Sequence, residues 1–508
     1  MERDQPTSYT ARQAVGLFVG LSAFVALLLL PAPTSMGEAA WKTAAVILLM
    51  GTWWVTEAVH IAVTALLPLV LFPTLGVLDA RAVSSVYADH VIFLFLGGLF
   101  IASAMERWGL HRRVAILILS RVGRSPRLVI LGFLVTTAGL SMWMSNTAAT
   151  LIMLPIALAI LDHASARGYE TGNGFGTALM LGLAYSASIG GIATPVGTPP
   201  NAVLLGALGK LFPDRPGIGF LDWMLFGVPT AATMVLFAWF YLVYVFFRVP
   251  TEGWREDRAF LRRQLRELGP MSRAERRASA LIVTVVLLWV SRGDLNLGTV
   301  VLPGWANLFP YPDQIQDSTT AIFGAVLLFL IPAGNESGVF LLDWKTAERI
   351  PWGVLVLLGG SLALAEGAGS SGLAWWVGSR LTLLGAVSPA VAICVVCLLM
   401  ACLTEFTSNT ATTTLMMPIL AATAQGMGID PLLLMVPGTL AASFGFMLPA
   451  GTPPNAIVFA SGYLTIPQMF WAGLGLDLIG VGVLTLFTYV IGVPALDISL
   501  IGMPGWAR

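Results

Sequence analysis

The chain has 508 residues, of which 57% are hydrophobic and 11% are charged, and its 27 Lys and Arg residues balance 27 Asp and Glu residues. Such a composition would be hard to keep in solution as a soluble protein, and the zero net charge gives no indication of nucleic acid binding. With a mean hydropathy of +0.83, the chain is predicted to be an all-α polytopic membrane protein.

Apolar runs of about 20 residues, each long enough to cross a bilayer core of about 30 Å, recur along the chain. The expected membrane segments are residues 12–31, 38–58, 60–77, 90–106, 127–163, 175–210, 221–248, 278–292, 319–334, 352–366, 386–424, 431–463 and 469–493. The first run ends without a convincing small-residue cleavage site, so no cleavable signal peptide is expected.

An internal repeat organises these segments. SNTAATLIMLPIALAI at 145–160 corresponds to SNTATTTLMMPILAAT at 408–423, and GTPPNAV at 197–203 corresponds to GTPPNAI at 451–457. Paired glycines precede each copy, at Gly97 and Gly98 and at Gly359 and Gly360. A repeat in a hydrophobic chain is typical of transporters whose binding site lies between the two copies.

Arginines crowd two predicted loops, at 107–127 and 248–277, and these loops predict the orientation. The positive-inside rule places both on the cytoplasmic side, so the chain between them must cross the membrane an even number of times. Three apolar runs lie between the groups, and one of them must therefore fail to cross. The polar patch at 141–147 makes 127–163 the best candidate for a re-entrant hairpin, because irregular backbone at membrane depth survives only against protein or water.

The same count through the second half predicts a hairpin at 386–424 that enters from the opposite face. The prediction is then eleven spanning helices and two hairpins in inverted repeats, with a cytoplasmic N-terminus and an external C-terminus. The protein is expected in the inner or cytoplasmic membrane.

The repeated strings carry chemistry suited to ions. Ser, Asn and Thr side chains offer hard neutral oxygens for an alkali cation and donors for a carboxylate. The proline pairs Pro199-Pro200 and Pro453-Pro454 must interrupt helices, which frees carbonyls for a cation and helix N-termini for an anion. A single Ser-Asn-Thr would be interpreted as a helix cap and a single GTPPN as a kink. Their joint repetition favours one binding site per repeat.

These strings, together with the run EAVHIAVTALLPLVLFPTLGV that begins at Glu57, resemble the divalent anion:sodium symporter family, which includes sodium-coupled dicarboxylate and citrate carriers. The resemblance covers almost the whole chain. It implies a homodimer in which each protomer has a scaffold part and a transport part that moves as an elevator. It also implies two sodium ions bound beside one dianion in the hairpins and interrupted helices.

By this resemblance, the first sodium site would use the side chains of Ser141, Ser145 and Asn146 and the carbonyl of Gly197. The second would use Thr404 and Asn409, with carbonyls around Thr407 and Gly451. The substrate would contact Asn146, Thr147, Thr198, Asn409, Thr410, Thr452 and Pro453. Other members of the family can carry Ser at the position of Thr198 and Ala at the position of Gly451. Thr198 keeps the hydroxyl, and Gly451 contributes only its backbone carbonyl.

The expected organisation is scaffold helices at 1–89, a first repeat at 90–248 with a broken helix at 175–210, a basic cytoplasmic connector at 249–277, scaffold helices at 278–351, and a second repeat at 352–508 with a broken helix at 431–463.

Charge balance favours symport. A dianion in the membrane needs compensating charge, yet the four strings contain no Lys or Arg, so Na⁺ is the expected coupling ion and no organic cofactor is expected. The alternatives are a sodium-independent anion exchanger, a carrier of sulfate or another divalent anion, and, less favoured, a channel. An enzyme is not expected, because the chain has no H-E-x-x-H, nucleophile-elbow or Walker string.

Other ionisable residues have weaker interpretations. Glu405 is an intramembrane carboxylate that would either tune cation binding or form a hydrogen bond within its hairpin. Cys394 and Cys397 form a C-x-x-C inside an apolar run, where they are expected to pack rather than bind metal.

Overall fold

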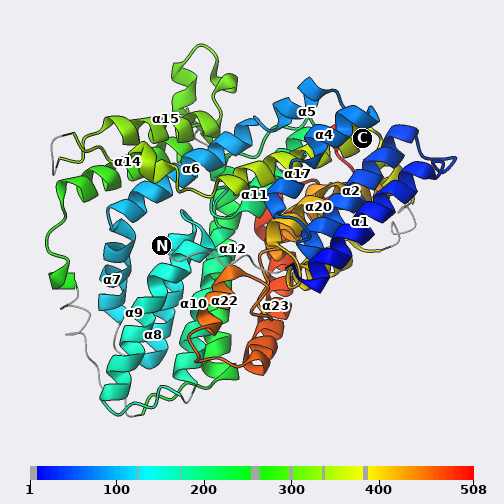
Figure 1. Cartoon of the computed structure of the whole chain (residues 1–508). Coiled ribbons are helices and arrows are strands. Elements are labelled where there is room, and N and C mark those ends of the chain that lie inside the picture. The colour runs from blue at the N-terminus through cyan, green and yellow to red at the C-terminus, as the bar shows by residue number, and fades with distance from the viewer. Residues whose placement is uncertain are drawn as a thin grey trace.

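The computed structural model describes residues 9–122, 125–172, 174–252, 263, 265–296, 301–334, 338–380 and 387–507. Within these ranges the chain is predominantly helical (Figure 1). A small departure from the all-α prediction is the antiparallel pair β1 (Leu295–Asn296) and β2 (Val301–Leu302).

The N-terminal helices α1 (Ala11–Leu29) and α2 (Glu38–Thr56) pack side by side. Glycine makes the close approach possible, since a Cβ atom at Gly16 would lie 1.9 Å from Thr56 Oγ1. Thr10 caps α1 by accepting a hydrogen bond from the Gln13 N–H, which satisfies one of the free donors at the helix start.

The membrane segment expected over 60–77 is divided into two helices. The structure has α3 (Ile61–Thr64) and α4 (Leu67–Leu75), separated by Ala65 and Leu66. Pro68 lies in the first turn of α4, where a missing N–H is tolerated but a continuous helix would lose a hydrogen bond. The freed carbonyl of Ala65 accepts a hydrogen bond from the Tyr87 hydroxyl instead. The chain continues through α5 (Ala80–Val86) and α6 (His90–Arg107).

The first arginine-rich segment is a helix, α7 (Leu110–Val122), and not the loop that was predicted. Arg113 Nε lies 2.9 Å from Glu275 Oε1, and its Nη1 donates to the Gly269 carbonyl at 2.8 Å. The two arginine-rich segments are therefore in direct contact, as expected if both lie on one side of the membrane. Residues 253–262 and 264, which include Arg255, Arg258 and Arg262, lie outside the described residues.

The first repeat contains a helix–turn–helix followed by an interrupted helix. After α6 and α7, its helices are α8 (Pro126–Ser141), α9 (Asn146–Ala166), α10 (Phe175–Gly191), α11 (Pro199–Leu211) and α12 (Phe220–Phe240), which continues as the π-helical turn η1 (Tyr241–Phe246). The interruption predicted at the proline pair is present, because α10 ends at Gly191 and α11 begins at Pro199.

Between the repeats, α14 (Arg273–Val290) begins inside the predicted connector, where Ser272 and Glu275 form a capping box. The following elements are η2 (Trp305–Leu308), η3 (Pro312–Gln314), α15 (Asp317–Leu330) and α16 (Trp344–Ala347).

The second repeat follows the same order as the first. Its elements are α17 (Trp352–Ser370), α18 (Leu373–Arg380), α19 (Pro389–Thr404), α20 (Asn409–Met427), α21 (Leu432–Ala441), α22 (Pro453–Phe459), α23 (Ile466–Phe487), η5 (Thr488–Gly492), α24 (Val493–Ala495) and η6 (Gly505–Ala507). Helix α18 was not predicted. Residue 386, the expected start of the second hairpin, lies outside the described residues.

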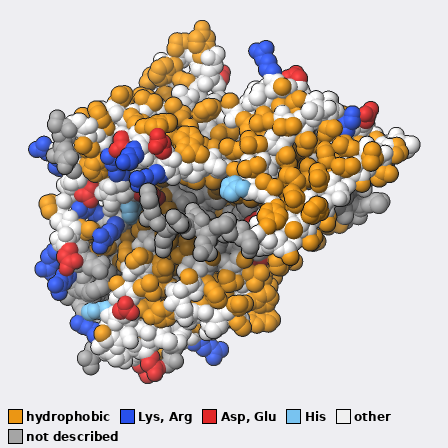
Figure 2. Space-filling view, viewed as in Figure 1, with side chains coloured by type: hydrophobic (Ala, Val, Ile, Leu, Met, Phe, Trp, Pro, Cys, Tyr) orange, Lys and Arg blue, Asp and Glu red, His pale blue; other side chains and the backbone are white. Residues whose placement is uncertain are grey.

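Six helical stretches among the described residues are long and apolar enough to cross a membrane. They are Ala11–Leu29, Ala80–Arg107, Asn146–Ala166, Phe220–Phe246, Trp352–Ser370 and Ile466–Ala495. Figure 2 shows hydrophobic side chains covering the surface over α1 and α2, where Val15, Phe18 and Val19 are exposed. The chain is therefore an integral membrane protein.

Helix α10 lies at the centre of the bundle, since every residue from Phe175 to Gly191 is buried. It contacts α8, α9, α12 and α22, and Figure 1 shows these elements running close together with α23. The interruption that follows α10 is also held inside the protein, since residues 192–198 are all buried.

Candidate functional site

The turn between α8 and α9 gathers oxygens around one hydroxyl. Ser141, the last residue of α8, is fully buried, and its Oγ lies 2.8 Å from Asn146 Oδ1 and 2.6 Å from the Ala187 carbonyl of α10. Asn146 is the first residue of α9. The helix–turn–helix and the first arm of the interrupted helix therefore meet at Ser141.

The turn between α19 and α20 repeats this arrangement. Thr404, the last residue of α19, is also fully buried, and its Oγ1 lies 2.6 Å from Asn409 Oδ1 and 2.7 Å from the Ala442 carbonyl, which directly follows α21. Asn409 is the first residue of α20. The sequence repeat is thus also a repeat of local geometry.

Each of these hydroxyls has one hydrogen but faces two acceptor oxygens. Only one of the two contacts can be a hydrogen bond, so the other brings two electronegative oxygens close together without a proton between them. A cation placed among such oxygens removes the repulsion. Hydroxyl, amide and backbone carbonyl oxygens are hard neutral ligands of the kind that alkali cations accept.

Glycines let the interrupted segment of the first repeat approach Asn146. A Cβ atom at Gly191 would lie 2.6 Å from Asn146 Oδ1 and 3.2 Å from the Thr198 Cβ, and one at Gly197 would lie 2.4 Å from the Gly191 carbonyl oxygen. Larger residues would therefore force the backbone apart. The structure brings together four predicted residues, namely Ser141, Asn146, Gly197 and Thr198.

Gly445 has the same place in the second repeat. A Cβ atom there would lie 3.4 Å from Thr404 Cγ2, 3.4 Å from the Gly451 carbonyl oxygen and 3.3 Å from Thr452 Cγ2. Three predicted residues, Thr404, Gly451 and Thr452, are therefore gathered around this glycine.

The N-termini of α11 and α22 offer few backbone donors. Both helices begin with two prolines, Pro199-Pro200 and Pro453-Pro454, which have no N–H groups. Thr198 forms no side-chain capping bond within the described chain, whereas Thr452 Oγ1 accepts from the Asn455 N–H at 3.4 Å. Donors for an anion must therefore come mainly from threonine hydroxyls and from the hairpin tips.

Other predicted residues are engaged locally. Ser145 is exposed and caps α9 by accepting from the Ala148 N–H at 3.2 Å. Thr407 is half-buried and donates to the Leu403 carbonyl at 2.9 Å. Thr147 is half-buried, and Thr410 is buried. Pro453 is exposed beside the buried Thr452.

Glu405 forms hydrogen bonds outside its own hairpin, which corrects one of the two predicted roles. Its side chain is buried, with Oε1 accepting from the Met447 N–H at 2.6 Å and Oε2 from the Leu448 N–H at 2.9 Å. The carboxylate therefore binds the segment between α21 and α22. The equivalent position in the first repeat is Met142, whose carbonyl accepts from Thr194 Oγ1 at 2.6 Å.

Asn201 and Asn455 were not among the predicted site residues. Asn201 Nδ2 donates to the Gly191 and Thr194 carbonyls, and Asn455 Nδ2 donates to the Gly445 and Leu448 carbonyls. Both asparagines end the repeated GTPPN string. Their position in a doubled motif was the available signal.

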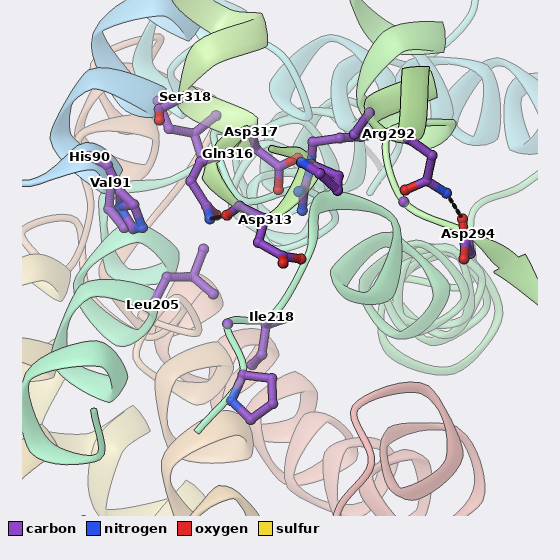
Figure 3. A pocket seen from close by; sticks show the side chains of 17 residues that line it. His90, Val91, Leu205, Ile218, Arg292, Asp294, Asp313, Gln316, Asp317 and Ser318 are labelled. Atoms are coloured by element: carbon purple, nitrogen blue, oxygen red, sulfur yellow. Dashed lines mark hydrogen bonds and ion pairs between the residues drawn. The ribbon is translucent and has the colours of Figure 1, made fainter. Parts of the chain in front are cut away.

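A separate cavity of about 520 Å³ lies beside the middle of α11 and the start of α15 (Figure 3). His90, Leu205, Asp313 and Ser318 are among its lining residues, and Arg292 lies 2.5 Å from Asp317 in an ion pair. None of the lining residues belongs to the four repeated strings. The cavity is therefore distinct from the site described above.

Comparisons with known proteins identify the family of the chain. The model of the family described as "Sodium:sulfate symporter transmembrane region" matches residues 11–495. The chain is 42% identical over 499 residues to the sodium-dependent dicarboxylate transporter SdcS of Staphylococcus saprophyticus, covering 97% of this chain and 94% of that protein. It is 41% identical over 489 residues to SdcS of Staphylococcus aureus, covering 95% and 92% respectively.

Two solved transporter structures share the fold at low identity. Neisseria gonorrhoeae MtrF, from a structure titled as illuminating a class of antimetabolite efflux pumps, has a TM-score of 0.57 and 14% identity, covering 96% of this chain and 97% of its own. Alcanivorax borkumensis YdaH has a TM-score of 0.58 and 16% identity, covering 90% and 99%. At this identity the likeness concerns the fold alone.

Proposed function

Because the chain belongs to the divalent anion:sodium symporter family, we propose that it is a secondary active transporter that couples sodium to the movement of a dicarboxylate of the succinate, malate and fumarate class. It is an integral protein of the plasma membrane and not an enzyme. Sodium is the coupling ion, as the names of the two curated relatives indicate for those proteins.

The observation that carries this proposal is the matched pair of oxygen clusters. In the first cluster, the Ser141 hydroxyl lies within 2.8 Å of the Asn146 amide oxygen and of a backbone carbonyl. In the second, the Thr404 hydroxyl lies within 2.8 Å of the Asn409 amide oxygen and of a backbone carbonyl. Two such clusters suit two monovalent cations. Two sodium ions would neutralise a dianion, which the strings themselves cannot do because they contain no Lys or Arg.

The proposed binding sites follow the sequence prediction. Side chains of Ser141, Ser145 and Asn146 with the Gly197 carbonyl hold the first sodium ion. Thr404 and Asn409 with carbonyls around Thr407 and Gly451 hold the second. The substrate carboxylates contact Asn146, Thr147, Thr198, Asn409, Thr410, Thr452 and Pro453.

The transport part is proposed to move as an elevator within a homodimer, with eleven spanning helices and two re-entrant hairpins in inverted repeats. The N-terminus is cytoplasmic and the C-terminus external. Support comes from the repeated order of elements and from the Arg113–Glu275 contact, which joins the two arginine-rich segments.

A second candidate substrate is sulfate or another divalent anion, which the family description favours because it names sulfate. The same two clusters would serve any dianion that fits between them. Competition separates the candidates, since only a true substrate should inhibit uptake of labelled succinate and itself accumulate.

The deciding experiment is uptake of labelled succinate into proteoliposomes with and without an inward sodium gradient. We expect accumulation only with sodium, and not with potassium or choline. If succinate does not accumulate, or if the three cations are equally effective, the symporter proposal is wrong.

A further inference from the structure

The asparagine of each GTPPN string lies in the first turn after a helix interruption. Asn201 is the third residue of α11 and Asn455 is the third residue of α22. Both side chains are fully buried. They lie where the backbone has lost its helical hydrogen bonds, because the carbonyls at the end of the preceding helix have no helical partners.

Each asparagine amide donates hydrogen bonds to such carbonyls in the same way. Asn201 Nδ2 lies 3.1 Å from the Gly191 carbonyl and 2.8 Å from the Thr194 carbonyl. Asn455 Nδ2 lies 2.8 Å from the Gly445 carbonyl and 2.9 Å from the Leu448 carbonyl. One side chain therefore uses both of its N–H groups to join two carbonyls three residues apart, in both repeats.

The glycines whose carbonyls these asparagines bind lie next to the proposed cation ligands. Gly191 packs against Asn146 Oδ1, and Gly197 packs against the Gly191 carbonyl. Gly445 packs between Thr404 and Gly451. A shift of either glycine would change the distance between a side-chain ligand and the carbonyl ligand that completes the same cluster.

We infer that Asn201 and Asn455 are positioning residues that set the size of the two cation sites, and thereby the affinity and selectivity for sodium. The inference rests on the proposed sodium symport. Neither asparagine need touch the ion, since each acts through the segment that carries the Gly197 or Gly451 carbonyl. The presence of this pair of hydrogen bonds in both repeats supports a functional role, because the two loops differ in sequence yet are closed by the same contacts.

The amide chemistry makes the inference specific. Replacement by alanine removes both N–H donors. The Gly191 or Gly445 carbonyl then loses its bond to the side chain, and the Thr194 or Leu448 carbonyl keeps only the backbone N–H of Gly197 or Gly451. Replacement by aspartate keeps the shape but turns a carboxylate oxygen toward the same two carbonyls, which repels them. Oδ1 of each asparagine has no hydrogen-bond partner within the described chain, so the contacts that these variants disrupt are those of Nδ2.

The test uses Asn201→Ala, Asn201→Asp, Asn455→Ala and Asn455→Asp in the full-length protein. Controls are Thr230→Ala and Thr488→Ala, because each removes a fully buried hydroxyl that donates to a carbonyl four residues earlier in its own helical stretch, outside the interrupted segments. The measured quantities are the sodium concentration for half-maximal succinate uptake and the ratio of rates with lithium and with sodium.

We expect the half-saturating sodium concentration to rise about 10-fold or more in the four asparagine variants, as happens when residues that orient metal ligands are removed. The lithium-to-sodium ratio should change as well, while both controls keep the wild-type values. A variant that lowers only the maximal rate, with unchanged sodium half-saturation and cation ratio, would overturn the inference.

A binding measurement covers variants that fold poorly. Asn201→Gln and Asn455→Gln keep the amide but displace it by one methylene, and sodium-dependent thermal stabilisation of the purified protein reports binding without transport. We expect weaker stabilisation by sodium in these variants, and unchanged stabilisation would overturn the inference. If wild-type uptake itself ignores sodium, the proposed function fails instead.

Discussion

Asn146 and Asn409 each begin a helix at a turn and each face a hydroxyl that already contacts a backbone carbonyl. We expect Asn146→Ala and Asn409→Ala each to lower the initial rate of succinate uptake about 100-fold or more, because each amide serves a cation and the substrate, and each hydrogen bond to a charged group contributes about 1.5–3 kcal/mol. Initial rates of uptake into proteoliposomes under an inward sodium gradient measure this effect.

Gln425→Ala is the matched control, because Gln425 carries an amide on α20 far from the turn and donates to the Ala507 carbonyl at 2.8 Å. It should keep near wild-type uptake. Retained uptake in Asn146→Ala or Asn409→Ala would place the binding site elsewhere.

Glu405 contributes an ordered carboxylate to one repeat only. It accepts N–H groups from Met447 and Leu448, and a glutamine at this position would direct its NH₂ group at one of these donors. We expect Glu405→Gln to destabilise the protein by about 1.5–3 kcal/mol and to raise the half-saturating sodium concentration. Thermal unfolding and uptake in the same preparation measure both effects, and wild-type values for both would show that the carboxylate is dispensable.

At the residue scale, the sequence identifies the site residues more reliably than it identifies their hydrogen-bond partners. The doubled strings single out Ser141, Asn146, Thr404 and Asn409, and the structure brings each pair together. The partners of Glu405 lie more than 40 residues away, and local patterns carry no information on such contacts. Asn201 was visible in its motif, but its role depends on carbonyls exposed by the helix break.

At the element scale, one contact joins α7 to the start of α14. Arg113 donates to both carboxylate oxygens of Glu275, and Glu275 also accepts from the Ser272 N–H at 2.6 Å. Burial opposes ionisation of Glu275, but the hydrogen bonds from Arg113 and Ser272 outweigh it, so the pKa of Glu275 lies below its usual value.

The lowered pKa makes this contribution to stability depend on pH. A carboxyl group whose pKa is lower in the folded state stabilises the fold above its unfolded pKa of about 4.3 and loses that contribution as the pH falls through the folded value. We therefore expect Glu275→Gln to lower the midpoint of thermal unfolding at pH 7, and the difference from wild type to shrink below about pH 4.

Thermal unfolding in detergent between pH 7 and pH 3.5 tests this expectation. Glu38→Gln is the control, because Glu38 forms an exposed pair with Lys42 and should contribute little. A pH-independent difference between wild type and Glu275→Gln would contradict the assignment.

Helix ends were predicted well where the residues themselves interrupt a helix. The proline pairs end one helix and begin the next, so the interruptions at α10–α11 and α21–α22 followed directly from the residues. The break between α3 and α4 was missed because the single Pro68 was not taken as an interruption, and because the Ala65 carbonyl that the break frees is satisfied by Tyr87, 22 residues away. Helix α7 was missed because the arginine count indicates a side of the membrane and not a secondary structure.

At the scale of the whole molecule, sodium and substrate should bind cooperatively. If cations remove the repulsion between the oxygens around Ser141 and Thr404, they organise both turns before the dianion binds. Thermodynamic linkage then requires each ligand to raise the affinity for the other by the same factor. We expect the apparent affinity for succinate to rise with sodium concentration, which substrate titrations at several fixed sodium concentrations will measure. An apparent affinity independent of sodium would contradict this order of events.

Transport by an elevator requires α20 to slide past α2. The two helices are in contact, since a Cβ atom at Gly51 would lie 3.3 Å from Leu415 Cδ2. A disulfide between cysteines at positions 51 and 415, in a background without Cys394, Cys397 and Cys402, should therefore stop succinate uptake while leaving sodium-dependent substrate binding measurable. Reduction should restore uptake.

A matched cross-link between positions 438 and 420 distinguishes arrested movement from general damage to the protein by cross-linking. A Cβ atom at Gly438 would lie 2.8 Å from Leu420 Cδ1, and both positions belong to elements that the proposed elevator movement would carry together, α21 and α20. This second cross-link should leave uptake near its uncross-linked rate, because it restrains no relative motion that transport needs. Full uptake by a verified 51–415 cross-linked protein would instead rule out sliding between α2 and α20, and the site would have to reach the other face by rearrangement within the transport part itself.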